Sequence, residues 1–351
     1  MTTLDRRTVV AGILGSLGAT VASPLIRLAE QGGAVVGGTA APHRVDIHHH
    51  FAPPAWVTAV KGRPLLQPAN TTWTPAKSIE DMDRGGVAVS MVSITNPGLW
   101  FGDQPMTRTL ARACNEYGAR LVQDHPKRFG LFAAIPLPDV DSSLAEIAYA
   151  YDTLKVDGIG LFTSYGDTWL GNPRFRPVME ELHRRRAVVH VHPTAANCCR
   201  NLDYAPGSAP GSMEYGTDTT RAIMGVAFSG DAHSYPNVRF IWSHAGGTVP
   251  FLAGRIEGAS RGAGDRLPDG FSTEIKRFYY DLAGATNRGA VASLLELVKP
   301  SQVLFGTDFP PGGTSAEYAK ALAELGFFNS ADIRAIERDN ALRLLPRLGS
   351  L

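Results

Sequence analysis

The stretch Val45-Asp46-Ile47-His48-His49-His50 opens the part of the chain that shows a regular pattern, and it decides the fold. A short apolar run ends in three histidines, which indicates a first strand near residues 44–48. Residues two apart on a strand face the same side. We therefore predict that His48 and His50 point together into one site, whereas His49 points away and is structural.

Histidine or aspartate also follows three later apolar runs, at His192, His244 and Asp308. In a barrel of parallel strands the carboxyl ends meet at one rim, so these side chains are expected to join His48 and His50 there. Scattered core and surface histidines are the alternative for any one of them, but the joint pattern favours a single site. Three neutral imidazoles and one carboxylate suit a divalent transition metal, zinc first, with manganese as the second choice.

The site is expected to hold one metal ion. A binuclear barrel needs a bridging group, often a modified lysine at the end of the fourth strand, and Gly158–Thr163 contains no lysine. Lys155 lies before that strand, at the opposite rim. His190 shares a face with His192 and is either a support for the ligands or buried packing. Asp308 binds the metal directly or through a shared proton.

Strand-like and helix-like segments alternate from residue 44 onward, without an internal repeat. The strand-like runs are short, mostly continuous and rich in Val, Ile and Phe, as expected for strands buried on both faces. They are predicted near 44–48, 87–94, 130–135, 158–162, 187–191, 238–243, 278–282 and 303–307. Eight strands with helical returns predict a (β/α)₈ TIM-type barrel over residues 41–351, with a mononuclear metal site at its carboxyl-terminal rim.

Two stretches fit no barrel helix. Residues 51–78 are rich in Pro, and residues 193–218 are rich in Pro, Gly, Ser and Asn. We interpret both as long loops at the rim that holds the histidines, where such loops usually shape a pocket. Trp56 and Trp73 give the first loop side chains to pack with.

Composition limits the classes of partner. The 34 basic and 33 acidic residues are nearly balanced and no basic stripe appears, which argues against nucleic acid. The three cysteines do not make a disulfide framework.

Residues 1–40 differ from the rest: Arg6-Arg7 precedes a mildly apolar run, which resembles a twin-arginine export signal. That run is too short to span a membrane. A periplasmic or exported protein is expected if the signal operates, and a cytoplasmic one otherwise.

The chain as a whole resembles the decarboxylase branch of the amidohydrolase superfamily, over roughly residues 44–345. Aminocarboxymuconate semialdehyde decarboxylase is the best-known member of that branch, and 6-methylsalicylate decarboxylase-type proteins are the nearer match. The motifs that carry the resemblance are Val45–Pro54, His192-Pro193, Asp218–Arg221, Ser243–Phe251 with Arg255, Gly306–Pro310 and, for the methylsalicylate type, Ser164–Gly171 and the Cys198-Cys199 loop.

The resemblance implies roles for individual residues. The metal ligands would be His48, His50, His192 and Asp308. His244 falls on the histidine that handles protons and orders the metal-bound water, with Asp308 beside it in the chemistry. Arg255 falls on an arginine that the family can donate across a dimer interface to the substrate carboxylate, so a homodimer is expected. Trp169 is a candidate for the wall of an aromatic substrate pocket.

Two activities use this ligand set. The first is non-oxidative decarboxylation of an aromatic, salicylate-type acid or a related small carboxylic acid, with release of CO₂. The second is metal-dependent hydrolysis of a lactone, ester or amide. They differ in what happens to the metal-bound water. A third interpretation, a barrel that keeps metal only for stability, leaves His244 and Arg255 without a purpose.

Overall fold

Eight parallel strands form one sheet whose order follows the chain, as the sequence predicted. The computed structural model describes residues 42–64, 66–194 and 211–350. The strands are β1 (Arg44–His50), β2 (Val87–Ser93), β3 (Phe129–Ala134), β4 (Gly158–Phe162), β7 (Val188–His192), β8 (Arg239–Trp242), β9 (Tyr279–Asp281) and β10 (Val303–Leu304). Each lies within two residues of a predicted strand except β10, which is shorter.

The sheet closes into a barrel where the segment after β10 meets β1. The amide of Ile47 donates to the carbonyl of Phe305 at 3.0 Å, and the amide of His50 donates to the carbonyl of Phe309 at 2.8 Å. In the other direction, the amide of Asp308 donates to the carbonyl of His48 at 2.7 Å. These backbone bonds continue the ladder beyond the two residues of β10. They place Asp308 beside the histidines of β1.

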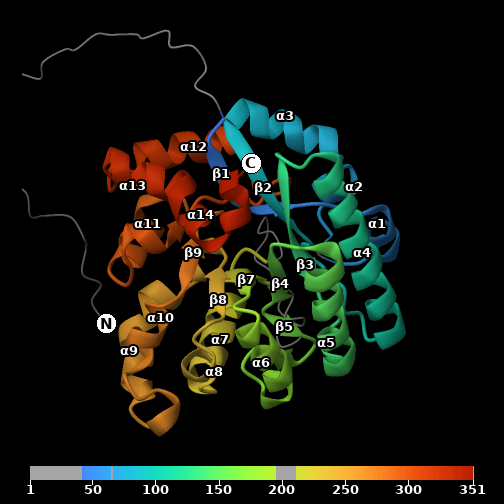
Figure 1. Cartoon of the computed structure of the whole chain (residues 1–351). Coiled ribbons are helices and arrows are strands. Elements are labelled where there is room, and N and C mark those ends of the chain that lie inside the picture. Colours follow the sequence, from blue (N-terminus) through green and yellow to red (C-terminus); the bar gives the residue numbers. More distant parts are fainter. Residues whose placement is uncertain (1–41, 65, 195–210, 351) are drawn as a thin grey trace, which may run out of the picture. The chain divides into compact units, whose positions relative to one another are not determined.

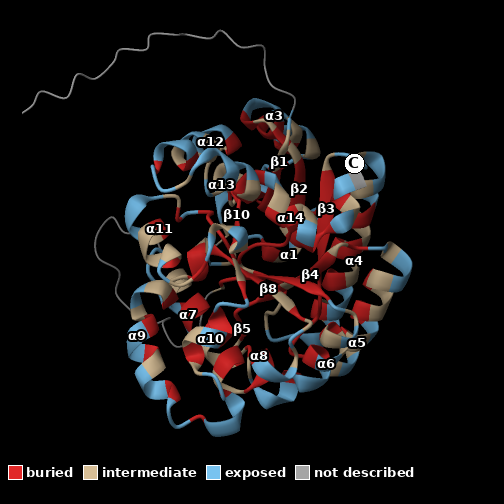
Figure 2. Cartoon of the chain, turned by 60° about the vertical axis from the view of Figure 1, so that its left-hand side comes forward, coloured by how far each residue is buried: buried red, intermediate tan, exposed pale blue. Residues whose placement is uncertain are grey.

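Helices surround the strands, one principal helix after each (Figure 1). In chain order these are α3 (Pro75–Gly85), α4 (Gln104–Asp124), α5 (Val140–Tyr149), α6 (Arg176–Arg184), α7 (Glu214–Phe228), α9 (Val249–Ser260), α11 (Arg288–Leu295) and α12 (Ser315–Glu324). Shorter helices α13 (Ser330–Arg334) and α14 (Asn340–Leu344) follow. Figure 2 shows buried strands inside a ring of helices whose outer faces are exposed. The (β/α)₈ barrel is confirmed.

The prediction of an irregular loop over 51–78 is wrong. That stretch contains α1 (Pro54–Val60) and α2 (Pro68–Thr71), and α3 begins within it. Each of the three has proline in its first turn, where the missing N–H costs nothing and the fixed φ favours the helix. The prolines that suggested a loop therefore start helices. Trp56 and Trp73 are buried, as expected.

A buried apolar cluster fills the barrel below the predicted site. It joins Val45 and Ile47 of β1 to Met91 of β2, Phe132 of β3 and Ile241 of β8. Because these residues come from strands around the barrel and pack together, they lie inside it. A larger cluster packs the outer faces of the strands against the helices. The interior is thus a packed core, and the site sits above it.

Two regions fall outside the description. The predicted export signal, 1–40, lies outside the described residues, as does 195–210, most of the second predicted loop. The end of that loop is helical, since α7 begins at Glu214. Among the residues that the structure describes, no helix is long and apolar enough to cross a membrane.

Candidate metal centre

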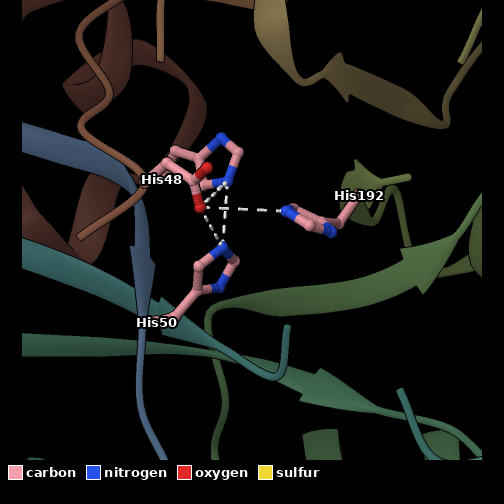
Figure 3. A group of neighbouring side chains, drawn as sticks. His48, His50 and His192 are labelled. Carbon is pink, nitrogen blue, oxygen red and sulfur yellow. Dashed lines mark hydrogen bonds and ion pairs between the residues drawn. The ribbon is translucent and has the colours of Figure 1, made fainter. Parts of the chain in front are cut away.

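Four predicted ligands converge at the carboxyl-terminal rim (Figure 3). The Nε2 atoms of His48 and His50, both on β1, lie 3.1 Å apart. Oδ1 of Asp308 lies 2.8 Å from Nε2 of His50 and 3.4 Å from Nε2 of His48. Nε2 of His192, at the end of β7, completes the group at 3.9 Å from the same oxygen. The structure therefore brings together residues up to 260 positions apart.

Each imidazole is held at its other nitrogen. Nδ1 of His48 lies 3.1 Å from Oδ2 of Asp281, and Nδ1 of His192 lies 2.7 Å from the carbonyl of Pro193. Nδ1 of His50 lies 3.2 Å from the carbonyl of Ser93. The Asp281 carboxylate and the two carbonyls can only accept, so these contacts place a proton on each Nδ1; Oγ of Ser93, also 3.2 Å from Nδ1 of His50, can accept from it as well. That tautomer leaves the Nε2 lone pairs facing the common centre, as in metal-binding histidines.

The residues fit a divalent cation. Nε2 of His192 is buried and has no hydrogen-bond partner within the described part of the chain, and the Nε2 atoms that face Oδ1 of Asp308 cannot donate to it when the protons are on Nδ1. Leaving a buried polar atom unpaired is costly, so both atoms need a partner that the protein does not supply. One cation at the centre would satisfy both, together with the lone pairs of His48 and His50. Three imidazole nitrogens and one carboxylate oxygen are a donor set that transition metals favour.

Charges at the site also favour a cation. Burial alone would lower the pKa of His48, but the Asp281 and Asp308 carboxylates outweigh it and raise that pKa to about 10. Burial lowers the pKa of His50, and burial with the neighbouring rings lowers the pKa of His192 well below its usual value. These two rings are thus neutral near pH 7. A metal ion competes with the His48 proton, so its binding releases a proton and weakens in acid.

His244 lies at the edge of the ligand group. Its Nε2 atom is 3.5 Å from Oδ2 of Asp308, the carboxylate oxygen that faces away from the other histidines. The ring is partly exposed, in contrast to the buried rings of His48 and His50. It therefore contacts the carboxylate rather than the centre of the group, which suits a proton carrier better than a ligand.

A left-handed turn aims the His244 ring. Four consecutive residues, His244 to Gly247, have φ of 54°, 55°, 75° and 65°. Such angles cost energy for His244 and Ala245, and backbone of this kind clusters at functional sites. A Cβ at Gly247 would overlap the carbonyl oxygen of Gly216 in α7. The two glycines of the H-A-G-G motif therefore let the chain turn sharply against α7.

We expect Gly247→Ala to lower the free energy of unfolding by about 2–4 kcal/mol, because strained backbone and a clash with main chain add together. Gly289→Ala is the matched control, since a Cβ there meets only an ordinary contact and alanine favours helix α11. Urea unfolding of both variants checks this. Equal stability of the two variants would mean that the turn relaxes freely.

Sequence reasoning missed Asp281, the last residue of β9. It is fully buried, and it bonds His48 and also Nε2 of His190 at 3.1 Å. His190 is thus a support for the ligands, one of the two alternatives. The signal was present, because Asp281 is the last residue of β9 and lies within the strand predicted at 278–282, and a buried carboxylate at a strand end is a candidate partner for the ligands.

His49 faces the other side of β1, as predicted. Its Nδ1 atom lies 3.0 Å from Oδ2 of Asp46, and its Nε2 atom lies 2.8 Å from Oγ of Ser78. The three side chains resemble a Ser-His-Asp arrangement. However, all are fully buried and Nε1 of Trp73 also donates to Ser78, so the serine has no access to a substrate. This network packs α3 against the barrel.

Neither Trp169 nor Arg255 makes a hydrogen bond or an ion pair with the four ligands. Trp169 belongs to an unpredicted hairpin, β5 (Ser164–Tyr165) with β6 (Thr168–Trp169), directly after β4. Its Nε1 atom donates to Asp218 at 2.5 Å, and the Arg221 guanidinium lies 5.2 Å from its ring centre. Arg255 is exposed on α9 and makes no hydrogen bond or ion pair with any described residue.

Comparison with known proteins agrees with this geometry. A decarboxylase, macB, of Penicillium terrestre is 36% identical over 87% of this chain and 95% of its own length. The 6-methylsalicylic acid decarboxylase of Penicillium expansum is 34% identical over 87% and 97%, respectively. The crystal structure of a dihydroxybenzoic acid decarboxylase from a Polaromonas species, with bound manganese and 2-nitroresorcinol, has a TM-score of 0.73 at 19% identity. The match covers 87% of this chain and 97% of the Polaromonas chain, and it shows that the two proteins share a fold.

A family model, described as amidohydrolase, matches residues 45–347. This range runs from the first strand to the helices after the last one and includes all four convergent ligands. The resemblance first suggested by the H-x-H motif is thus confirmed over the whole barrel. The chain belongs to the amidohydrolase family.

Proposed function

We propose that this protein is a metal-dependent, non-oxidative decarboxylase, a carboxy-lyase that removes CO₂ from a salicylate-type aromatic acid. The observation that carries the proposal is the ligand group with His244 beside Asp308 at 3.5 Å. Relatives that are 34–36% identical along almost their whole length, and are named decarboxylases, support the reaction type. The methyl-substituted salicylate named for one of them is the first substrate to test.

The reaction needs a proton at the ring carbon that carries the carboxylate. When bound, the metal ion supplies Lewis-acid attraction for the ortho hydroxyl and carboxylate oxygens of the substrate. His48, His50, His192 and Asp308 would hold it. His244 and Asp308 share the region where a proton is held, and one of them delivers it to the ring carbon. The carbon–carbon bond then breaks, its electron pair returns to the ring, and CO₂ leaves.

The test is CO₂ release from purified, metal-defined protein on a panel of hydroxybenzoates that includes 6-methylsalicylate. Esters and lactones form the second panel, because the same ligands activate water in hydrolases. We expect stoichiometric CO₂ and the decarboxylated phenol from one salicylate-type acid. Turnover confined to esters or lactones would instead identify a hydrolase.

We propose zinc as the resident metal, with manganese as the alternative. Three imidazole nitrogens favour zinc, whereas the related Polaromonas structure holds manganese. Elemental analysis of protein purified without added metal, followed by activity after reconstitution with each ion, distinguishes the two.

We propose that the protein acts as a homodimer in which Arg255 reaches the partner's pocket. Arg255 lies on the exposed face of α9, four residues after Phe251, which is 85% exposed. A large exposed aromatic beside a guanidinium that pairs with no described residue suits an isologous contact, in which each copy buries the other's side chains.

We propose that Trp169, on the hairpin after β4, contacts the aromatic substrate.

We expect Arg255→Ala to raise the Michaelis constant for the carboxylate substrate by one to two orders of magnitude, roughly the worth of a charge-assisted bidentate contact. Mixing this variant with inactive His192→Ala should restore activity, since a mixed dimer has one pocket with both metal and arginine. Arg261→Ala, another arginine at the end of α9, is the matched control. If subunits exchange and no activity returns, the arginine is not shared.

We also propose export through the twin arginines, which are read by a receptor in that pathway. Replacing Arg6 and Arg7 together by lysine should retain the protein inside the cell, as measured by fractionation. Unchanged distribution of the lysine variant would exclude this signal.

A further inference from the structure

Asp281 occupies a place where a barrel normally has an apolar side chain. It lies inside the barrel with His190, next to the core residue Phe132, whose ring stacks on His190 at 5.4 Å. Both polar residues are almost completely buried. Burying an ionised carboxylate costs several kcal/mol unless hydrogen bonds compensate, and apolar residues of the same volume often do better for stability. Stability alone does not explain this choice.

Four hydrogen bonds compensate the Asp281 carboxylate. Oδ2 accepts from Nδ1 of His48 and Nε2 of His190, and Oδ1 accepts from the amides of His244 and Ala283, all at 3.1 Å. One side chain thus touches a metal ligand on β1, a buried histidine on β7 and the start of the turn that carries His244. These elements are otherwise separate around the barrel.

Gly306 leaves room for the contact between Asp281 and His48, because it has no side chain. A Cβ at Gly306 would lie 2.9 Å from Cβ of His48 and 3.2 Å from Cβ of Asp281. Any larger residue would push the two apart. The glycine before Thr307-Asp308 thus gives the carboxylate its approach to His48.

We propose that Asp281 is a positioning residue that sets the tautomer and angle of the ligand His48 and, through its other oxygen, the backbone position of His244. His190 orients Asp281 in turn, because its Nε2 atom donates to the same Oδ2 that accepts from His48, and the two imidazole rings lie edge to face at 4.8 Å. This role rests on the metal site and not on the identity of the substrate. Metal affinity therefore tests it even if the protein does not decarboxylate a salicylate-type acid.

Asp281→Asn separates positioning from packing, because asparagine has nearly the same volume. Both carboxylate oxygens accept hydrogen bonds, whereas an amide has only one accepting oxygen. If the amide NH₂ faces His48, the ring must accept at Nδ1 and carry its proton at Nε2, where the metal binds. If the NH₂ faces the backbone amides of His244 and Ala283 instead, N–H groups on both sides point at each other. We then expect the His244 turn to shift.

The decisive measurement is metal affinity, by competition with a chromophoric chelator on metal-depleted protein. We expect the dissociation constant of Asp281→Asn to rise tenfold or more, the usual scale for a residue that orients a ligand. Cobalt-substituted protein should show an altered visible spectrum. Asp81→Asn is the matched control, since Asp81 is equally buried and accepts from Ser315 rather than from a ligand. Native affinity in folded Asp281→Asn overturns the proposal.

A second variant keeps the test decisive if Asp281→Asn does not fold. His190→Phe retains the stacking with Phe132 but removes the donor to Asp281, and we expect a threefold to tenfold weaker metal affinity. Unchanged affinity in this variant would leave Asp281 without the orienting partner that the proposal requires.

The link to His244 has its own readout at saturating metal. Asp281→Asn should still lower kcat under these conditions. Its effect should largely disappear in a background that already carries His244→Ala, because residues that act as a unit are not additive. Full additivity would show that Asp281 acts on the metal ligand alone.

Discussion

His244→Ala is expected to lower kcat by two to four orders of magnitude while the protein keeps its metal. The ring is not needed to complete the ligand group, because three histidines and Asp308 already converge without it. Its Nε2 atom faces Oδ2 of Asp308 at 3.5 Å, within reach for the proton transfer proposed for these two groups. The expected loss is the usual contribution of a positioned proton-transfer group.

Kinetics and metal analysis on the same preparation check this expectation. His125→Ala is a suitable control, since that histidine caps the end of α4 and its ring packs edge-on against Phe129. Near-normal turnover of His244→Ala would remove the residue from the mechanism. Loss of metal from the same variant would make it a ligand instead.

His192→Ala should lose both the metal and the activity. Nε2 of His192 is buried and has no hydrogen-bond partner among the described residues, and its ring is the ligand that β7 supplies. Removing it leaves donors only from β1 and the segment after β10, all on one side of the centre. Three donors on one side do not enclose a cation tetrahedrally.

Elemental analysis should give about one divalent ion per chain for the native protein and less than a tenth of that for His192→Ala. His183→Ala, a partly buried histidine on α6, controls for loss of an imidazole elsewhere. Two tightly held ions per native chain would contradict the mononuclear site, which rests on the absence of lysine from Gly158–Thr163.

The barrel could be predicted because parallel strands that are buried on both faces appear in the sequence as short, nearly continuous apolar runs. Short, largely apolar runs such as Phe240–Trp242 recur along the chain, and four of them lead into a histidine or an aspartate. The parity of a strand by itself separates His48 and His50 from His49. Strand ends and parity together were sufficient to predict the four ligands as neighbours.

Contacts between distant elements were beyond the reach of the same reasoning. Nothing in the local pattern around Asp281 shows that it meets His48 and His190, since that contact depends on the curvature of the whole barrel. Composition also misled, because the prolines of α1, α2 and α3 were interpreted as loop signals although they begin helices. Local patterns predict which element forms more reliably than they predict what it touches.

The seam between β1 and the segment after β10 has a consequence for biogenesis. The chain supplies two ligands at residues 48 and 50 and the carboxylate only at 308, and the seam is closed by bonds such as Thr307 to Asp46. During synthesis, more than 250 residues must leave the ribosome before the last ligand exists. The complete ligand group therefore exists only once the first strand has met the segment after β10. A cation bound there would hold these two parts of the chain together, and it would stabilise the closed barrel more as the metal supply rises.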